Sequence, residues 1–407
     1  MKRGEGIERD VLMLGGGPAG LAAALFLAKQ GLTVALVDRD SALAADGAES
    51  RPRKDLRTAA LLQPAIEALR RAGVWERIAP TATPLNTMRL VDAGGAANRA
   101  RTRTDFAARE VEKSAFGANV ANAELKAALL SAVGEEPAVT LFAPSQARQL
   151  TLREDAVLAE LSTGERIRAA VAVGADGRES QVRAAAGLQA PRFDYGQDAM
   201  VFTVSHDQPH QNISTEILRE GGPFTLVPFL DAADGTSRSS VVWMEGRKAA
   251  TRLMALDDAA FEEAVNDRSL GVLGRLTVCS RRMAWPVITQ LATRFHGRRA
   301  ALIAEAAHVT PPIGAQGLNM SLADGETLAS LLGEAKRATR DLGSEAVLAQ
   351  LTRRRYGDVA RRLAATAALN GAAIGALRPV RDLRQAGLEI LRRSPPLRQA
   401  AMRFGLG

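Results

Sequence analysis

The hydrophobic pattern near the start of the chain predicts a strand, a helix and a second strand. Residues 11–14 and 33–37 are short apolar runs, and an alanine- and leucine-rich segment at residues 19–29 lies between them. Short apolar runs bounded by turn residues are typical of buried strands, and longer apolar segments are typical of helices. We therefore expect a β-α-β unit, in which the helix connects two parallel strands.

A glycine-rich turn separates the first predicted strand from the helix. It has the form G-x-G-x-x-G, in which the first glycine permits the turn, the second lets the backbone approach a pyrophosphate, and the third lets helix and strand pack closely. The motif has this meaning only between a strand and a helix, which is its position here. The helix start also favours phosphate, because its N–H groups are free. The residues expected at the phosphates are Gly15, Gly17, Pro18, Ala19 and Gly20.

Asp38 follows directly after the second predicted strand. An acid at this place in a dinucleotide-binding unit accepts a hydrogen bond from a ribose hydroxyl. We expect Asp38 to bind the adenosine ribose of a dinucleotide, and the unit by itself does not distinguish FAD from NAD.

The rest of the chain alternates between helical and strand-like patterns. Helices are expected over residues 57–78 and 119–130, an apolar strand at residues 170–177 ends in a turn, and residues 299–332 end in a further helix that begins near Leu318. Residues 199–205, 224–229 and 239–244 are short apolar or alternating runs, which predict a mostly antiparallel sheet. Residues 257–278 have a helical pattern.

In this order, the segments resemble the class A flavin monooxygenases of the para-hydroxybenzoate hydroxylase type, and within that group most of all the ubiquinone-biosynthesis hydroxylases. The resemblance implies an α/β fold, with a Rossmann-like FAD-binding domain, an inserted, mostly antiparallel β-sheet substrate domain and a helical C-terminal tail. The FAD-binding domain is expected to comprise residues 1–85, 103–190 and 289–335. Residues 86–102 and 191–288 are expected to form the substrate domain, and residues 336–407 the basic C-terminal region.

The resemblance also implies an activity. The expected enzyme is an FAD-dependent monooxygenase that uses NAD(P)H as a transient reductant and O2 to hydroxylate an aromatic ring. Its expected substrate is a lipid-soluble prenylated phenol or quinol of ubiquinone biosynthesis. Two alternatives stay open at this point: a hydroxylase of a soluble small phenolic compound, and a non-catalytic flavin-binding or assembly protein.

Several residues outside the glycine turn match the family's cofactor site. Arg57 is expected to reach the phosphates from the helix that follows it, and Asn122 stands where the family has a polar residue at the cofactor. Asp176 and Gly177 match an Asp-Gly motif associated with the cofactor and the nicotinamide. The loop expected against the flavin ring is Pro311, Pro312, Gly314, Gln316, Gly317, Leu318 and Asn319.

One departure from the family pattern falls within this site. The family has Gly-Asp before Ala-Ala-His, and the aspartate binds a ribityl hydroxyl of FAD, whereas this chain has Ala304 and Glu305. Glu305 keeps the acceptor on a side chain one methylene longer, and Ala304 adds a Cβ close to the cofactor. We expect FAD to bind, with an affinity that these two residues alter.

Polar side chains in the predicted substrate domain are candidates for contact with substrate. Buried polar groups are more often held by hydrogen bonds within the protein than by a ligand. No Ser-His-Asp triad and no metal-ligand spacing is recognisable, so we expect a bound cofactor to carry the chemistry, and no catalytic residue is identified. The candidates are Tyr195, Gln197, His206, His210 and Glu216.

Positive charge is concentrated at the C-terminal end. The chain has 407 residues and a formal net charge of +8, and residues 336–407 contain 15 Lys and Arg against 5 Asp and Glu. A nucleic-acid-binding protein would spread basic residues over its fold and interleave aromatic ones, so no nucleic-acid partner is expected. Residues 380–393 alternate apolar residues with arginines, which suits a helix on an anionic membrane, a contact in a biosynthetic complex, or packing on the protein itself.

The chain is expected to be cytoplasmic, with peripheral contact at the inner face of the membrane as an alternative. Residues 11–28 carry no charge, but four glycines and a proline interrupt them, which favours a turn over a membrane span. Glu5, Glu8 and Asp10 lie where a signal peptide would be positive. The single cysteine, Cys279, excludes an intrachain disulfide.

Overall fold

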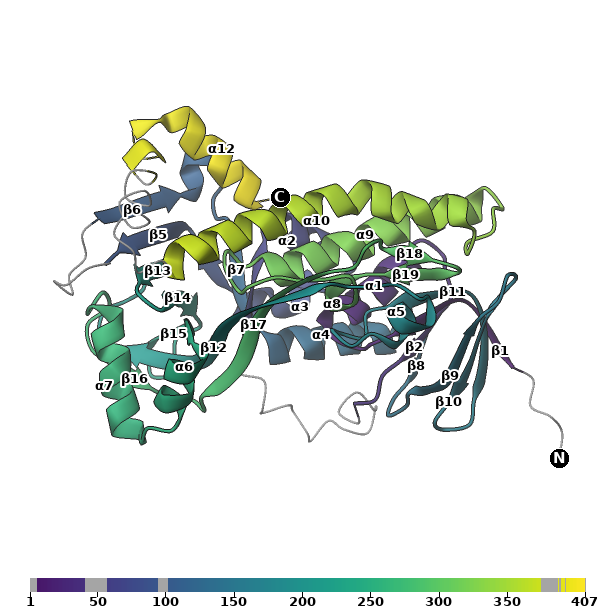
Figure 1. Ribbon diagram of the computed structural model, residues 1–407, viewed down its shortest axis with the longest axis horizontal. Helices are drawn as coiled ribbons and strands as arrows, with labels where there is room; N and C mark the ends of the chain where they lie inside the picture. The colour runs from purple at the N-terminus through teal and green to yellow at the C-terminus, as the bar shows by residue number, and fades with distance from the viewer. Residues whose placement is uncertain are drawn as a thin grey trace.

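Two large β-sheets and one small sheet organise the chain (Figure 1). The computed structural model describes residues 6–40, 57–93, 102–374, 387, 389–391 and 393–406. In this part of the chain, long helices cover the sheets, and the predicted α/β fold with a mostly antiparallel second sheet is confirmed.

The first sheet contains the predicted β-α-β unit. Its order is β18-β19-β11-β1-β2-β8, and the neighbours from β19 to β8 are parallel. Its central strands are apolar at successive positions because helices cover the sheet. The strands are β1 (Ile7–Leu14), β2 (Val34–Val37), β8 (Val139–Phe142), β11 (Arg166–Gly174), β18 (His296–Gly297) and β19 (Ala300–Leu302), with a hairpin of β9 (Ala147–Leu152) and β10 (Val157–Leu161) beside β11.

Three helices form a layer associated with this sheet. The helix α1 (Pro18–Lys29) contacts both α4 (Asn122–Gly134) and α9 (Gln316–Arg337). A Cβ on Gly325 of α9 would lie 3.1 Å from the Cβ of Ala23, so a glycine lets the two helices approach closely. The short helices α5 (Gln181–Ala185) and α8 (Ala304–Ala307) follow β11 and β19.

The second sheet is mixed but mostly antiparallel. Its order is β20-β17-β12-β15-β14-β13-β5-β6, and β13 and β5 form its parallel pair. Helices α6 (Arg247–Met254) and α7 (Asp258–Ser269) pack on the face that carries Phe202 and Trp243. The strands are β5 (Thr87–Asp92), β6 (Thr102–Ala107), β12 (Arg192–His206), β13 (Ile213–Arg219), β14 (Gly222–Phe229), β15 (Ser237–Gly246), β16 (Leu276–Val278), β17 (Met283–Leu291) and β20 (His308–Val309).

A third sheet corrects two expectations. The prediction of a helix over residues 57–78 is wrong for its first residues, because β3 (Thr58–Leu62) is a strand that pairs with β7 (Gly117–Ala121). The strand β4 (Thr83–Leu85) pairs with the other edge of β7. The helix predicted from residue 119 begins only at Asn122 for the same reason. Tertiary strand pairing overrides the helical propensity of these alanine- and leucine-rich segments. The helices that follow β3 are α2 (Gln63–Arg71), α3 (Trp75–Ile78) and the turn η2 (Ala79–Thr81).

Two described helices represent the C-terminal region. The helix α10 (Glu345–Ile374) runs beside α9 and continues to β13 and β14 (Figure 1). The helix α12 (Pro395–Leu406) contacts η3 (Ala108–Val111), where Arg398 binds the carboxylate of Glu110 and lies over the ring of Phe106. Most of the predicted basic helix at residues 380–393 lies outside the described residues. Within the described ranges, no helix is long and apolar enough to cross a membrane.

Candidate cofactor and substrate site

The glycine turn is built by contacts that leave no room for side chains. A Cβ on Gly15, whose φ is +108°, would lie 2.2 Å from the carbonyl oxygen of Ala175, and a Cβ on Gly20 would lie 1.9 Å from the carbonyl oxygen of Gly15. Gly17 differs, because no atom of a described residue beyond its immediate chain neighbours lies within 4 Å of its Cβ position. Gly15 and Gly20 therefore shape the turn, and Gly17 presents open backbone at the start of α1.

Asp38 lies against the glycine turn. Its carboxylate accepts hydrogen bonds from the N–H of Gly16 and, at 2.7 Å, from the N–H of Asp40. These two bonds fix the carboxylate at the carboxyl end of β2, which is where open α/β sheets bind ligands.

Arg57 and Asn122 lie next to each other, but Arg57 precedes a strand and not the predicted helix. The N–H of Asn122 donates to the carbonyl of Arg57 at 3.0 Å, and the Arg57 guanidinium lies 5.2 Å from the ring centroid of Trp285. The Oδ1 atom of Asn122 is buried and has no hydrogen-bond partner in the described part of the chain. An unpartnered buried oxygen is costly, so this atom suits a ligand donor.

Asp176 and Gly177 lie beside the glycine turn that begins at Gly15. One carboxylate oxygen of Asp176 accepts from the N–H of Gln181 at 2.6 Å, and the other is buried with no partner among the described residues. Gly177 has a φ of +83°, and its Cβ position is open. The Asp-Gly motif thus offers an unpaired acceptor and, at Gly177, a backbone with open space beside it.

Ala304 adopts a backbone conformation that favours glycine, the residue that the family pattern has at this position. Ala304 has a φ of +55°, in the left-handed region that favours glycine. Such a conformation costs a residue with a Cβ about 1–2 kcal/mol. The side chain of Glu305 is half-exposed, and its Oε2 lies 3.2 Å from the Nε of Arg178, so its carboxylate already has a partner within the protein.

The proline-rich loop leads into α9 and is tied to other elements. Gly314 and Ala315 have φ values of +64° and +56°, which turn the chain into the helix. Gln316 donates to the carbonyls of Gly314 and Gly405, and accepts from Arg362 at 2.8 Å. α10 and α12 therefore both hold the first residue of α9.

Of the other loop residues, some are fixed by hydrogen bonds or core packing, and others are exposed to solvent. Asn319 accepts from the N–H of Leu62 and donates to the carbonyl of Ala60, both at 2.8 Å, so its side chain fastens α9 to β3. Leu318 packs partly buried against the main core. Pro312 and Gly317 are exposed and lie on either side of the turn.

A buried ion cluster under this loop was not anticipated from the sequence. Asp324 of α9 binds His308 of β20 at 2.6 Å and Arg355 of α10 at 2.8 Å, and its side chain has no exposure to solvent. Burial acts to raise the pKa of Asp324, but the charges and hydrogen bonds of His308 and Arg355 outweigh it and lower the pKa. The only signal in the sequence was a histidine and an acid flanking the proline-rich loop.

Four of the five polar candidates in the predicted substrate domain make hydrogen bonds within the protein. Tyr195 contacts Thr289, Gln197 contacts Asn370, His206 contacts Ser239, and His210 contacts the Phe229 carbonyl. Glu216 differs, because no hydrogen bond or ion pair joins it to the described residues.

These features fit a dinucleotide cofactor such as FAD. The Cβ positions of Gly17 and Gly177 are open, so a ligand can approach the backbone there, and the unpartnered oxygens of Asn122 and Asp176 are suited to ligand donors. The amino end of the 22-residue helix α9 adds N–H groups that an anion can bind.

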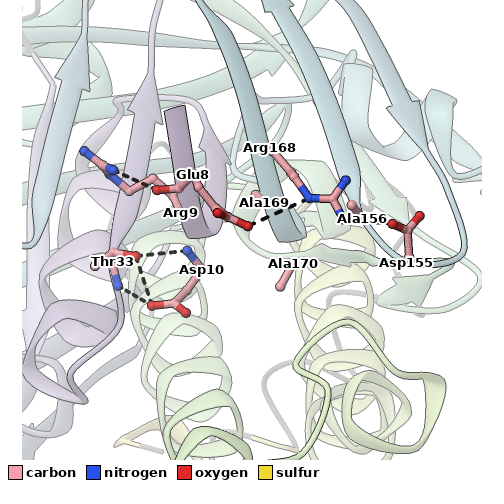
Figure 2. Close-up of a pocket in the computed structure, with 9 residues that line it drawn as sticks. All are labelled: Glu8, Arg9, Asp10, Thr33, Asp155, Ala156, Arg168, Ala169 and Ala170. Atoms are coloured by element: carbon pink, nitrogen blue, oxygen red, sulfur yellow. Dashed lines mark hydrogen bonds and ion pairs between the residues drawn. The ribbon is translucent and has the colours of Figure 1, made fainter. Parts of the chain in front are cut away.

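A separate surface pocket of about 310 Å³ lies elsewhere (Figure 2). It is lined by the start of β1, at Glu8, Arg9 and Asp10, whereas the glycine turn follows the carboxyl end of β1. Two of its charged groups form close ion pairs, Arg168 with Asp155 at 2.8 Å and Asp10 with Lys336 at 2.7 Å. This pocket is therefore distinct from the candidate cofactor site.

Comparison with known proteins agrees with this geometry. The FAD binding domain family matches residues 8–365, and the chain belongs to this family. It is an FAD-dependent monooxygenase. Among relatives, it is 33% identical to ubiquinone hydroxylase UbiL of Rhodospirillum rubrum, over 98% of this chain and 89% of the relative. It is 27% identical to the 3-demethoxyubiquinol 3-hydroxylase of Escherichia coli K12, over 98% of both chains.

Solved structures show the same fold at lower identity. The p-nitrophenol 4-monooxygenase PnpA of Pseudomonas putida DLL-E4 has a TM-score of 0.78 and 20% identity, over 99% of both chains. PqsL of Pseudomonas aeruginosa, a probable FAD-dependent monooxygenase, has a TM-score of 0.76 and 21% identity, over 94% of this chain and 99% of that one.

Proposed function

We propose that this enzyme hydroxylates the aromatic ring of a lipid-soluble, prenylated phenol or quinol in ubiquinone biosynthesis. The observation that carries the proposal is the similarity along almost the whole chain to ubiquinone hydroxylases. Bound FAD supplies the redox chemistry, with NAD(P)H as reductant and O2 as the source of the new oxygen.

The chain's own residues bind and orient the cofactor in this proposal. Gly17 and the start of α1 contact the pyrophosphate, Asp38 the ribose, and Asn122 and Asp176 use their unpartnered oxygens on polar groups of FAD. Prolines would restrict the backbone of the loop before α9 beside a bound flavin ring, and the N–H groups at the start of α9 would favour negative charge on that ring.

An apolar contact supports a hydrophobic substrate. Ile313 of the proline-rich loop packs with Ala199, Met244 and Val287 of the second sheet. This cluster joins the expected flavin loop to the sheet and carries no charge. A soluble phenolic acid would instead require a basic side chain to neutralise its carboxylate.

Turnover tests this function directly. The FAD-loaded protein is supplied with NADH or NADPH and with a prenylated phenol or 4-hydroxybenzoate, and the product is identified by mass spectrometry. We expect one added oxygen on the prenylated phenol alone. Preferential hydroxylation of 4-hydroxybenzoate would refute the proposed substrate class, and absence of turnover with both would favour the non-catalytic alternative.

We also propose that the C-terminal region contacts the membrane surface, where such a substrate dissolves. Of the large apolar side chains that are exposed in the described structure, Leu369, Ile390 and Leu397 are 59%, 56% and 53% exposed and lie in this basic region. Exposed apolar residues beside arginines suit an anionic lipid surface.

Flotation with phosphatidylglycerol vesicles tests the contact. Replacement of Leu369, Ile390 and Leu397 by Gln should reduce recovery with the vesicles severalfold. The matched control replaces Met88 and Leu230, which are 38% and 42% exposed outside this region, and should float like the wild type. Equal recovery of both variants would contradict the membrane contact.

A further inference from the structure

Glu216 lies on the face of the second sheet that is turned toward the proline-rich loop. Directly paired residues of neighbouring strands point to the same face. Glu216 pairs with Thr225, Thr225 pairs with Val242, and Val242 packs in the cluster that contains Ile313 of the loop. The adjacent residue Ile217 points the other way, into the core under α6 and α7.

The position of Glu216 follows from this register. Two strand spacings, about 10 Å, separate it from Val242 across the sheet. Its other neighbour, Leu90, packs with Met402 of α12, and α10 contacts both β13 and β14. Glu216 therefore lies where the two C-terminal helices meet the sheet, within the length of a substituted aromatic ring from the loop cluster.

The carboxyl group of Glu216 has no partner in the described structure. Its side chain keeps some accessible surface, but it lies deep in the protein, and desolvation raises its pKa to about 7. β14 contains no charged residue, α10 contains none after Arg362, and Arg398 of α12 is paired with Glu110. An unpaired carboxyl at such a depth is costly unless it serves a ligand.

Two hydroxyl groups on the same face are also unpartnered. Ser240 lies two residues before Val242 on β15, and Thr104 of β6 pairs with Leu90, the neighbour of Glu216. Ser240 and Thr104 are 0% and 3% exposed, and their hydroxyl oxygens have no hydrogen-bond partner among the described residues. Hydroxyl groups donate and accept, so this face is suited to a ligand that carries oxygen atoms.

We propose that Glu216 binds the ring hydroxyl of the phenolic substrate and accepts its proton. The phenol O–H bond breaks, the proton bonds to a carboxylate oxygen of Glu216, and a phenolate and a neutral carboxylic acid result, with no change in oxidation state. The phenolate ring is richer in electrons than the phenol and is the better acceptor of a new oxygen. This role rests on the proposed function, because it requires a phenolic substrate.

The ionisation of bound 4-nitrophenol tests the role without turnover, because the neutral and ionised forms of this probe absorb at different wavelengths. Once Glu216 holds the shared proton, its neutral carboxyl group donates a hydrogen bond to the ionised probe, which favours the phenolate form. In the full-length, FAD-loaded protein, we expect the constant for the first ionisation of the bound probe to be at least tenfold larger in wild type than in Glu216→Gln. The matched control Glu220→Gln, an exposed glutamate after the same strand, should behave like wild type.

Infrared difference spectra of wild type against Glu216→Gln provide a second measurement. A protonated carboxyl band that titrates near neutral pH and shifts when the probe binds would support the proposal. An equal ionisation constant in wild type and Glu216→Gln, or no probe binding to the wild type, would overturn it. Hydroxylation of a prenylated phenol together with equal constants would remove the role of Glu216 and leave the proposed function in place.

Discussion

The Nε2 atom of His308 lies 2.6 Å from the Oδ2 atom of Asp324, and the two side chains are 1% and 0% exposed. Arg355 binds the other oxygen of the same carboxylate. One buried acid thereby joins β20, α9 and α10, the elements that precede, follow and support the expected flavin loop. The loop conformation therefore depends on a charge cluster that does not itself need to touch the cofactor.

Replacement of Asp324 by Asn should destabilise the protein strongly. The change leaves Arg355 without its buried carboxylate, and breaking a buried ion pair from one side costs about 3–5 kcal/mol. Chemical denaturation measures the loss. The control Glu326→Gln, on the same helix as Asp324, removes a solvent-accessible pair with Arg71 of α2 and should cost less than about 1 kcal/mol. Comparable losses in the two variants would argue against the cluster.

The contribution of Asp324 should also depend on pH. Folding lowers the pKa of this carboxyl below its ordinary value of 3.8, so its stabilisation is present above that pH and is lost as the pH falls through the folded-state pKa. The difference in unfolding free energy between wild type and Asp324→Asn should therefore shrink below about pH 4. A difference that stays constant between neutral and acid pH would be inconsistent with a charged Asp324.

Replacement of Ala304 by Gly should stabilise the protein and strengthen FAD binding. The left-handed backbone of Ala304 favours glycine, and after the entropy of glycine in the unfolded chain is subtracted, a gain of about 0.5–1 kcal/mol is expected. Thermal unfolding and FAD titration measure the two effects. Ala306→Gly, within the same short helix, should instead destabilise, and a loss of stability in both variants would show that Ala304 is not strained.

Gly17 and Gly20 should respond differently to alanine. A methyl group on Gly20 meets the backbone of Gly15, so Gly20→Ala should lower the free energy of unfolding by about 1–3 kcal/mol or more. A methyl group on Gly17 enters open space, so Gly17→Ala should keep its stability and lose FAD affinity by about tenfold or more. Thermal unfolding of the FAD-free protein and FAD titration separate the two cases. Full FAD affinity in Gly17→Ala would contradict the proposed pyrophosphate contact.

Arg398 should control the docking of α12. Its guanidinium binds Glu110, whose pKa it lowers, and lies 4.5 Å from the ring centroid of Phe106. Arg398→Met should release the helix and increase hydrogen exchange across residues 395–406 about tenfold, in line with the loss of about 1–2 kcal/mol of local stability. Arg403→Met changes an exposed arginine of the same helix and should leave exchange unaltered. Unchanged exchange in Arg398→Met would mean that Met402 and its neighbours suffice for docking.

The sequence by itself determined the cofactor end of the molecule. The strand, glycine turn and helix at residues 11–29 are largely local features, because Gly15 has a φ of +108° and a Cβ on Gly20 would meet the carbonyl oxygen of Gly15 within the same turn. The family resemblance extended this to FAD and to aromatic hydroxylation, and both are supported by the matches to known proteins. The short apolar runs likewise predicted the antiparallel sheet.

Only the tertiary structure decided which residues are used by the fold and which stay free. Residues 58–62 have a helical composition but pair with β7, because long-range hydrogen bonds outweigh local propensity. The same holds for the polar candidates: Gln197 and His206 are occupied by Asn370 and Ser239, which lie 173 and 33 residues away in the chain. Glu216 is distinguished from them by register alone, since strand pairing sets the face on which a side chain lies, and no local pattern specifies which distant strand will be its neighbour.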